Sequence, residues 1–420
     1  MTNNIFKPLF GAAAFAILTT GCVDEFEPQS STVTADQVSS APGAYENFVS
    51  SLTATLAGEF CYSPSSQYPF DFGFPSFFLI RDVMGHDIAT RSSWFSSWYE
   101  ADGYAPTTAI CQYPWTCYYS WIKSCNTVIS LAKTDLQEEK LDGLGRAYAI
   151  RAMLYMDLAQ MYGMRSYAYD KECLTVPIVT DETSGDQLAN NPNATNEQIW
   201  AFILSDLDEA EKYIDQSKTN DVYTPGLAFV QGLKARAYLI VNDWANAEKY
   251  AKLAQEGYSP MSADEYTDWE TGFNTPNGAW IFGLQFNAED PCILENDGDT
   301  SWGSQMFIEI NPETSGCGYA ANYGQPHAID RHLYETIPAT DARKKCYISF
   351  KIDDMSGAEA EEALLSYTKH PTWIENCAAS TDAGTVGGLE LKFRTAGGDN
   401  GRDNQKIGFV CSVPVMRVEE

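Results

Sequence analysis

Residues 118–163 have the sequence YYSWIKSCNTVISLAKTDLQEEKLDGLGRAYAIRAMLYMDLAQMYG, and this stretch decides the fold. Apolar residues recur through it every three or four positions, which is the spacing of one face of an α-helix. The first such row is Trp121, Cys125, Val128 and Ala132, and the second is Ala147, Ile150, Leu154, Leu158 and Met161. We therefore predict two buried helices that pack on each other. We expect Gly163 to end the second helix in the left-handed conformation that glycine adopts without steric cost.

The second predicted helix also carries a motif. It contains Gly145-Arg146-Ala147-Tyr148-Ala149-Ile150-Arg151-Ala152, followed by Leu154-Tyr155 and Tyr162-Gly163. These residues resemble the GEARFLRA…YY…YG signature of the SusD/RagB family, which comprises nutrient-binding outer-membrane lipoproteins of Bacteroidetes. Trp121-Ile122 and Cys125-Asn126-Thr127-Val128-Ile129 resemble the W…I…N.VI helix of the same family. Arg146 departs from the glutamate that the family has at this position.

Further helices are predicted downstream. Thr195 and Gln198 form a capping box before the apolar row Ile199, Ile203, Leu207, Ala210 and Ile214. Thr224-Pro225 is the expected start of the next helix, and Asp243 is the expected cap of a helix from Trp244 to Glu256. A tetratricopeptide unit is indicated by the offsets of Ala235, Tyr238, Ala247, Ala251 and Ala254. We predict an all-α, tetratricopeptide-like helix-pair bundle with long loop-rich insertions and little β structure, as the SusD/RagB resemblance also implies.

Residues 1–21 have the features of an export signal. Lys7 precedes an apolar run from Leu9 to Leu18, which is too short to cross a bilayer, since that takes about twenty residues. Thr20-Gly21-Cys22 resembles a lipobox, so we expect a signal peptide at 1–21 and a lipid anchor on Cys22. Ordinary signal-peptidase cleavage, or none, is the alternative. Residues 22–40 would form a polar tether, and Asp24-Glu25 resembles the signal that sends such lipoproteins to the outer face of the outer membrane.

We divide the remaining chain into three parts. Residues 41–260 are expected to form a helical region with aromatic-rich loops, and residues 261–410 a loop-rich region that faces the ligand, with a strand at Trp280–Phe286. Residues 411–420 are expected to begin a C-terminal helix, because Pro414 suits a first turn and a similar stretch opens a long helix in the family. The helix would then be incomplete, as in a truncated product. A naturally short family member is the alternative.

Composition excludes several classes of protein. The 57 acidic and 27 basic residues give a net charge of −30, which repels nucleic acid. An aromatic content of 13% excludes general disorder. None of the 11 cysteines forms a CxxC pair, so a zinc site is not expected. The cysteines are either free and buried or bridged, with Cys111 and Cys117 the best candidates for a bridge. Gly397–Asn404 could hold Ca²⁺ but is expected to be a solvated loop, so no cofactor is predicted.

The motifs favour binding over catalysis. The chain has no GxSxG motif, no P-loop and no dinucleotide fingerprint, so we do not expect an enzyme. Aromatic rings match the apolar faces of sugars, and the candidate ligand-binding residues are Arg81, Trp94, Trp98, Tyr104, Trp115, Trp302, Tyr319 and Tyr323. The resemblance implies that the protein captures an oligosaccharide and passes it to a TonB-dependent outer-membrane transporter. A peptide-binding family member and a secreted carbohydrate-active enzyme are the alternatives.

Overall fold

The computed structural model describes residues 41–418 except 42, 64, 67, 86, 91–93, 269–272, 274, 288–299, 309–318, 324–325, 376, 378, 381–386 and 394–410. The predicted signal peptide, Cys22, the tether and the Gly397–Asn404 loop lie outside the described residues. None of the described helices combines the length and the apolarity that a bilayer crossing requires.

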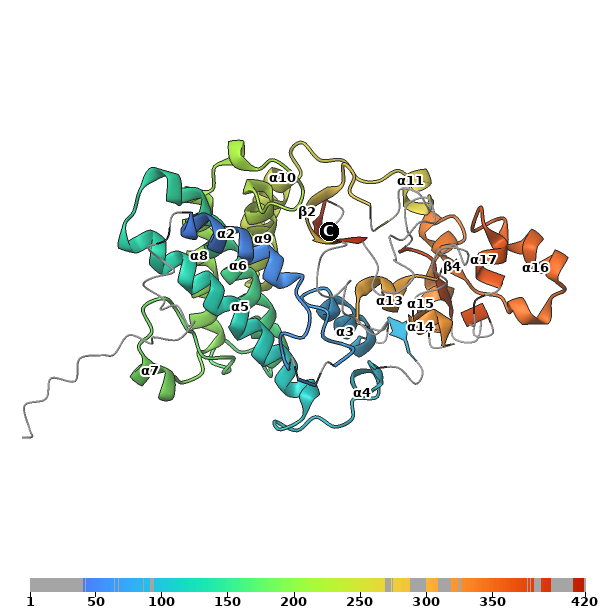
Figure 1. The fold of residues 1–420 in the computed structure, drawn as a ribbon, viewed down its shortest axis with the longest axis horizontal. Helices are drawn as coiled ribbons and strands as arrows, with labels where there is room; N and C mark the ends of the chain where they lie inside the picture. The colour runs from blue at the N-terminus through green and yellow to red at the C-terminus, as the bar shows by residue number, and fades with distance from the viewer. Residues whose placement is uncertain are drawn as a thin grey trace, which may run out of the picture. The chain divides into compact units, whose positions relative to one another are not determined.

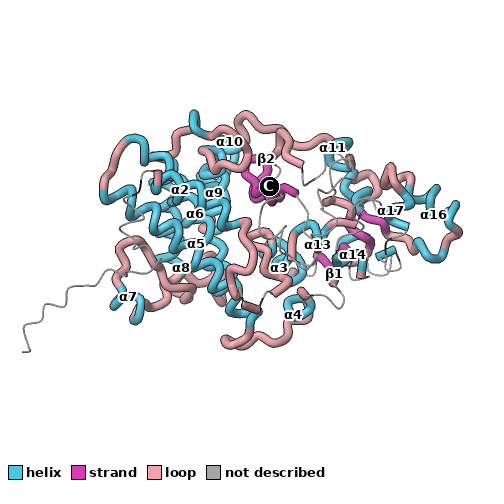
Figure 2. The backbone as a smooth tube through the Cα atoms, viewed as in Figure 1, coloured by secondary structure: helices cyan, strands magenta, loops and turns pink. Residues whose placement is uncertain are grey.

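Five helices packed in sequence order form a helical array (Figure 1). They are α5 (Ala109–Thr134), α6 (Glu138–Tyr162), α8 (Asn196–Tyr213), α9 (Leu227–Ile240) and α10 (Trp244–Ala254). Each packs on the next: α5 on α6, α6 on α8, α8 on α9 and α9 on α10. This arrangement confirms the predicted bundle of helix pairs, and Figure 2 shows how few strands accompany it.

The predicted hairpin at 118–163 is confirmed as α5 and α6. Both apolar rows are buried except for Met161, which is half-buried. The first helix is longer than predicted, because it begins at Ala109 and continues through Pro114. Tyr113, Cys117 and Tyr118 are fully buried around that proline, so tertiary packing sustains a helix that the sequence pattern placed in a loop.

Two local predictions on this hairpin are wrong. Gly163 follows α6 with φ −73° and ψ 120°, which is extended backbone and not a left-handed cap. Glycine is needed there because a Cβ would lie 2.5 Å from the carbonyl oxygen of Ala159. Cys111 and Cys117 are free, because both lie on α5, where six residues correspond to a rise of roughly 9 Å. That separation exceeds the Cα distance of about 7 Å that a disulfide can bridge.

The later helices follow the predicted caps with one exception. Thr195 and Gln198 form the predicted capping box of α8, and Asp243 accepts a hydrogen bond from the backbone N–H of Asn246 at the start of α10. The exception is α9, which begins at Leu227 after Gly226 and not at Thr224-Pro225. Thr224 donates its hydroxyl to Asp221 instead, so the pair belongs to the preceding turn.

A two-stranded antiparallel sheet pairs β2 (Trp280–Phe286) with β6 (Cys411–Arg417). The strand at β2 is confirmed, but the helix predicted at 411–420 is wrong. Val413 and Val415 are β-branched, which favours a strand once a partner is present. Pro414 lies opposite Gly283, next to register shifts in β2, and a bulged position of this kind tolerates a residue without an N–H.

A second, smaller core lies around a four-stranded sheet in the order β1-β3-β5-β4. The strands are β1 (Ile88–Ala89), β3 (Ala328–Ile329), β4 (Tyr347–Ile348) and β5 (Gly388–Glu390), with all neighbours antiparallel. The short helices α16 (Gly357–Leu364) and α17 (Pro371–Glu375) contribute Leu364 and Ile374 to this core.

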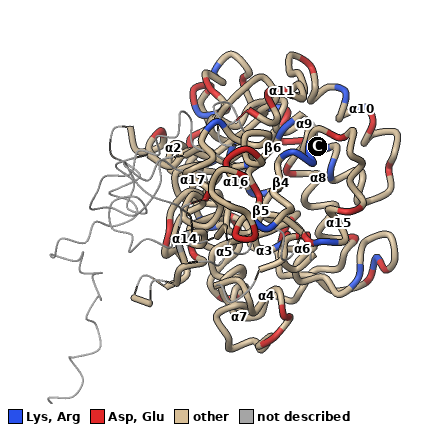
Figure 3. The backbone as a smooth tube through the Cα atoms, turned by 90° about the vertical axis from the view of Figure 1, so that its right-hand side faces the viewer, with Lys and Arg blue, Asp and Glu red and all other residues tan. Residues whose placement is uncertain are grey.

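The remaining elements are short, apart from α2 (Ala44–Leu56) and α3 (Ser76–Met84). They are α4 (Ser96–Tyr99), α7 (Gly185–Ala189), η1 (Gln216–Lys218), α11 (Ala263–Thr267), α13 (Trp302–Met306), α14 (Tyr319–Asn322), α15 (Arg331–Thr336), η2 (Ala342–Cys346) and η3 (Ile352–Asp354). Acidic and basic positions are interspersed along the described backbone (Figure 3).

Candidate functional site

The predicted ligand-binding rings fall into two groups by exposure. Trp98 and Trp302 are buried, at 2% and 3% exposure, whereas Trp94, Tyr104, Trp115 and Tyr323 are exposed, at 46%, 46%, 38% and 64%. Trp98 packs on Phe70 and Phe95 and is part of the large core. The side chain of Tyr319 lies outside the described residues. The sequence therefore named both core rings and surface rings as one platform.

Arg81 holds two helices together. Its Nη2 donates to Oδ2 of Asp157 at 2.7 Å and to the hydroxyl of Tyr118 at 3.3 Å, and the Tyr118 hydroxyl donates to the same carboxylate at 2.7 Å. These contacts join α3 to α5 and α6. The predicted role of Arg81 in ligand binding therefore competes with a clear structural role.

Trp302 lines the most sugar-compatible hollow among the described residues, which we call the aromatic cavity. It has a volume of about 370 Å³, within the usual range for small-ligand sites. Residues far apart in the sequence line it: Phe78, Asp82, Tyr266, Phe273, Trp302, Arg343, Lys392, Phe393, Val413, Pro414 and Arg417. They come from α3, α11, α13, η2, β6 and the segments that hold Phe273 and Lys392.

The rings of the cavity form a connected set. Phe393 meets Trp302 edge to face at a centroid distance of 4.9 Å, and Tyr266 meets Phe273 in the same way at 4.4 Å. Phe273 and Phe393 lie 6.0 Å apart, and Phe78 lies 6.5 Å from Trp302. Such packing fixes the ring positions before a ligand arrives, which lowers the entropy lost on binding.

Charged side chains lie directly on these rings. Nζ of Lys392 is 4.3 Å from the centre of Phe273 and 5.3 Å from that of Phe393. The guanidinium carbon of Arg417 is 4.1 Å from the centre of Phe273, and its Nη2 lies 2.7 Å from the sulfur of Met261. Arg343 is held by Asp341 through two N–H groups. The cavity therefore combines ring surfaces with charged hydrogen-bond donors.

Two carboxyl groups in this region have raised pKa values. Partial burial raises the pKa of Asp82 to about 6, against the opposing charge of Lys392. Burial also raises the pKa of Glu390, on β5, to about 7; Lys392 opposes this rise and Asp82 adds to it. The indole N–H of Trp302 is buried without a hydrogen-bond acceptor among the described residues, so it is a donor that a ligand could use.

Sequence reasoning missed most of this cavity. Tyr266, Phe273, Lys392, Phe393 and Arg417 stand in separate segments, and none of them belongs to a local motif. Phe78 was not among the predicted site residues. The dense aromatic stretch at 60–116 contributes only Phe78 and Asp82 to the cavity lining; its other rings mainly build the core.

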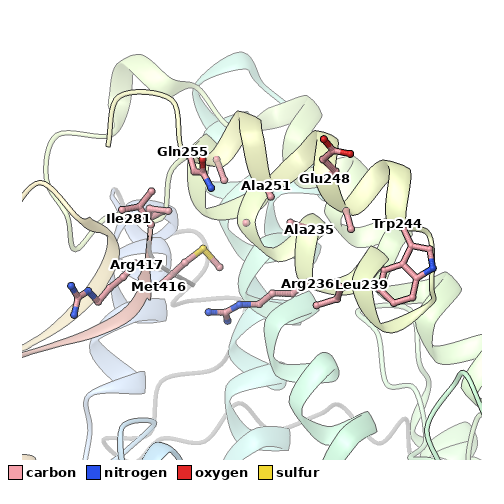
Figure 4. Close-up of a pocket in the computed structure, with 14 residues that line it drawn as sticks. Ala235, Arg236, Leu239, Trp244, Glu248, Ala251, Gln255, Ile281, Met416 and Arg417 are labelled. Atoms are coloured by element: carbon pink, nitrogen blue, oxygen red, sulfur yellow. The ribbon is translucent and has the colours of Figure 1, made fainter. Parts of the chain in front are cut away.

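A second hollow, the apolar groove, lies between α9, α10 and β6 and has a volume of about 320 Å³. Figure 4 shows Ala235, Arg236 and Leu239 of α9 facing it, with Trp244, Glu248 and Ala251 of α10 alongside. Alanine and leucine methyl groups dominate its walls. It offers fewer polar groups and flat rings to a sugar than the aromatic cavity does.

Comparisons with known proteins agree with this fold. The family model SusD-like_3, described as "Starch-binding associating with outer membrane", matches residues 78–239. A SusD-like carbohydrate-binding protein from Bacteroides vulgatus is similar in structure with a TM-score of 0.67 at 20% identity, covering 90% of this chain and 68% of that one. No curated protein is significantly similar in sequence.

Two further structures illustrate the breadth of the likeness. A SusD superfamily protein from Bacteroides thetaiotaomicron has a TM-score of 0.61 at 17% identity, covering 89% of this chain and 72% of that one. A laminarin-binding SusD-like protein has a TM-score of 0.56 at 15% identity, covering 89% and 77%. The chain thus has the fold of SusD-like proteins, and its residues 78–239 match the SusD-like family model.

The residues that resemble the SusD/RagB signature build the scaffold. Arg151 lies within the signature and pairs with Asp206 of α8, and Asn126 of the first motif accepts a hydrogen bond from the same guanidinium. The signature therefore predicted the fold and not the ligand site. In the part of the chain that the structure describes, no three His, Cys, Asp or Glu residues gather as they would around a metal ion.

Proposed function

We propose that this protein binds a glycan in the aromatic cavity. The observation that carries the proposal is the connected ring set around Trp302, Phe273 and Phe393, with Lys392 and Arg417 placed on those rings. Rings match the C–H faces of sugars, and the charged N–H groups can donate to hydroxyl groups. Membership of a family with carbohydrate-binding members supports the same conclusion.

We further propose that the glycan is handed to a TonB-dependent outer-membrane transporter, with no chemical step on this chain and no cofactor. The lipobox-like Thr20-Gly21-Cys22 supports anchoring through Cys22, and the acidic pair Asp24-Glu25 supports an orientation that faces the cell exterior. Trp94, Tyr104, Trp115 and Tyr323 remain candidates for outer subsites because their rings are exposed.

A direct test is titration calorimetry against a panel of neutral and acidic oligosaccharides. Phe273→Ala and Trp302→Ala should each weaken binding about fivefold or more, since a lost ring contact is worth on the order of 1 kcal/mol or more. Trp244→Ala is the matched control, because Trp244 is exposed on the apolar groove and not in the aromatic cavity. Circular dichroism melting checks that each variant is folded.

Three results would contradict the proposal. If Trp244→Ala abolishes glycan binding and the cavity variants retain it, the glycan binds outside the aromatic cavity. Affinity for a peptide library without affinity for any glycan would favour the peptide-binding alternative. Release of reducing ends from a bound oligosaccharide would show that the protein is an enzyme.

A further inference from the structure

The aromatic cavity has the opposite charge balance to the rest of the chain. Its lining holds three basic side chains, Arg343, Lys392 and Arg417, and one acidic side chain, Asp82. The whole chain holds 57 acidic and 27 basic residues. A cavity with the average composition of the chain would hold more acidic than basic side chains. The excess of basic side chains in this cavity therefore needs an explanation of its own.

Two of the cations are held by rings. Lys392 lies over Phe273 and Phe393, and Arg417 lies over Phe273. A cation–π contact uses the face of the ring and leaves the N–H groups of an ammonium able to donate. Arg343 differs, because Asp341 takes two of its N–H groups and balances its charge. Lys392 is therefore the best-placed partner for an anionic group of a ligand.

The two acidic groups near Lys392 have raised pKa values, so they lose their charge at a higher pH than free carboxyl groups do. Partial burial raises the pKa of Asp82 to about 6, and burial raises that of Glu390, which is only 5% exposed, to about 7. A bound carboxylate that approached Lys392 would favour protonation of both groups further. The local field near neutral pH is thus less negative than the count of carboxyl groups indicates.

We propose that the aromatic cavity selects glycans that carry carboxylate groups, namely uronic acid oligosaccharides, with Lys392 as the main partner of the carboxylate. The inference rests on the proposed glycan-binding function and names its substrate class. The half-buried rings of Phe78 and Phe393 contact the sugar, and the ammonium of Lys392 forms a charge-assisted hydrogen bond with the carboxylate. A neutral glycan of the same shape would keep the ring contacts and lose that bond.

The experiment compares oligosaccharides that differ only in charge. Tetra- to hexamers of galacturonic acid, glucuronic acid and mannuronic acid are titrated against the full chain, beside their methyl esters and neutral cello- and malto-oligosaccharides. The acids should bind on the order of tenfold more tightly than their esters, as one charge-assisted bond provides. The difference should shrink as NaCl rises from about 50 to about 500 mM, because salt screens the pairing.

Variants locate the charge effect. Lys392→Met keeps the aliphatic stem over the rings, and it should reduce affinity for an acid by about tenfold while changing affinity for its ester less than about twofold. Lys252→Gln is the control, because Lys252 pairs with Glu248 on the surface of α10. The comparison of acid with ester needs no variant, so a poorly folded Lys392→Met would not block the test.

The outcomes separate this inference from the function on which it rests. Equal affinity for acids and esters, or binding of neutral glycans only, would overturn the selection of uronic acids and leave glycan binding intact. An equal loss for acid and ester in Lys392→Met would show that Lys392 acts through packing and not charge. Failure of every acidic and neutral glycan to bind would overturn both proposals.

Discussion

Arg151 on α6 and Asp206 on α8 form a buried bidentate ion pair. Nε donates to Oδ2 and Nη2 donates to Oδ1, each at 2.8 Å. Nη1 donates to Asn126 on α5 at 2.7 Å and to Asp181 at 3.3 Å. One guanidinium thus connects three helices and a loop, and its fixed geometry specifies how the helices align. The pair carries little solvent exposure, at 3% and 5% of each side chain.

The first prediction is that Arg151→Met destabilises the protein by about 3–5 kcal/mol, because it leaves the Asp206 carboxylate buried without its partner. The free energy of unfolding in urea measures the effect. The double variant Arg151→Met with Asp206→Leu should recover a large part of the loss. If the double variant is no more stable than the single one, the cost arises from packing and not from the orphaned charge.

Leu154 tests the hairpin that the sequence predicted. Its side chain is fully buried between the packed helices, so Leu154→Ala should cost about 2–5 kcal/mol through lost burial and a cavity. Leu188→Ala is the matched control, since Leu188 on α7 is 53% exposed, and it should change stability by less than about 0.5 kcal/mol. Similar losses in both variants would show that Leu154 is not part of the core.

The buried carboxyl group of Glu390 should make the free energy of unfolding depend on pH. Burial raises its pKa from 4.5 to about 7, so the native state holds more protons than the unfolded state between those values. Its contribution to stability is therefore complete below pH 4.5 and is lost as pH rises through about 7. Asp82 adds a fall in the same direction between 3.8 and about 6.

Glu390→Gln should remove much of this fall. We expect the variant to be more stable than the parent at about pH 8, by on the order of 1–3 kcal/mol, and similar to it near pH 4.5. Thermal melting at about pH 4.5, 6 and 8 provides the measurement, and Glu361→Gln on the exposed face of α16 serves as control. A variant that is less stable than the parent at the alkaline end would show that Glu390 has a compensating partner when ionised.

Alanine variants of Trp98 and Trp115 compare a ring in the core with a ring at the surface. Trp98→Ala should cost about 3–5 kcal/mol, because its ring is almost fully enclosed by the core. Trp115 packs on Tyr119 and Tyr162 but keeps 38% of its surface exposed, so Trp115→Ala should cost at least about 1 kcal/mol less. Equal losses in urea unfolding would place Trp115 in the core as well.

Cys22 tests the proposed anchor. Cys22→Ala should move the protein from the membrane fraction to the soluble fraction of expressing cells, because it removes the site of lipid attachment. Cys22→Ser is an equivalent variant with a smaller change in shape. Protease accessibility of the parent on whole cells checks that it faces the exterior. A variant that stays in the membrane fraction would show that another segment holds it there.

Periodicity predicted the elements whose partners lie nearby in the sequence. The rows at Trp121–Ala132, Ala147–Leu158 and Ile199–Ala210 all became core faces, since each helix packs on the next one. It failed at β6, because the strand exists only through pairing with β2, far earlier in the chain. Pro414 favoured a helix start locally, and no local signal could reveal Gly283 opposite it.

The candidate site was predicted only in part, for a similar reason. Trp302 was named because its ring stands in a polar stretch, but Phe273, Lys392 and Arg417 meet it only through tertiary structure. Trp98 was named with it and is as deeply buried in the core, but it does not line the cavity. A high aromatic content therefore indicates that a chain has rings that could contact a ligand. The fold decides which of these rings lie together in one site.

The aromatic cavity draws its lining from residues 78 to 417. A chain that emerges from the ribosome, or that is threaded across a membrane from its N-terminus, can form the α5–α6 hairpin long before Arg417 is available. The cavity can be completed only after residue 417 has been added to the chain. The proposed sugar affinity therefore requires the whole span from α3 to β6, and a protease that cuts between the helical array and β6 could abolish it while leaving the helical array folded.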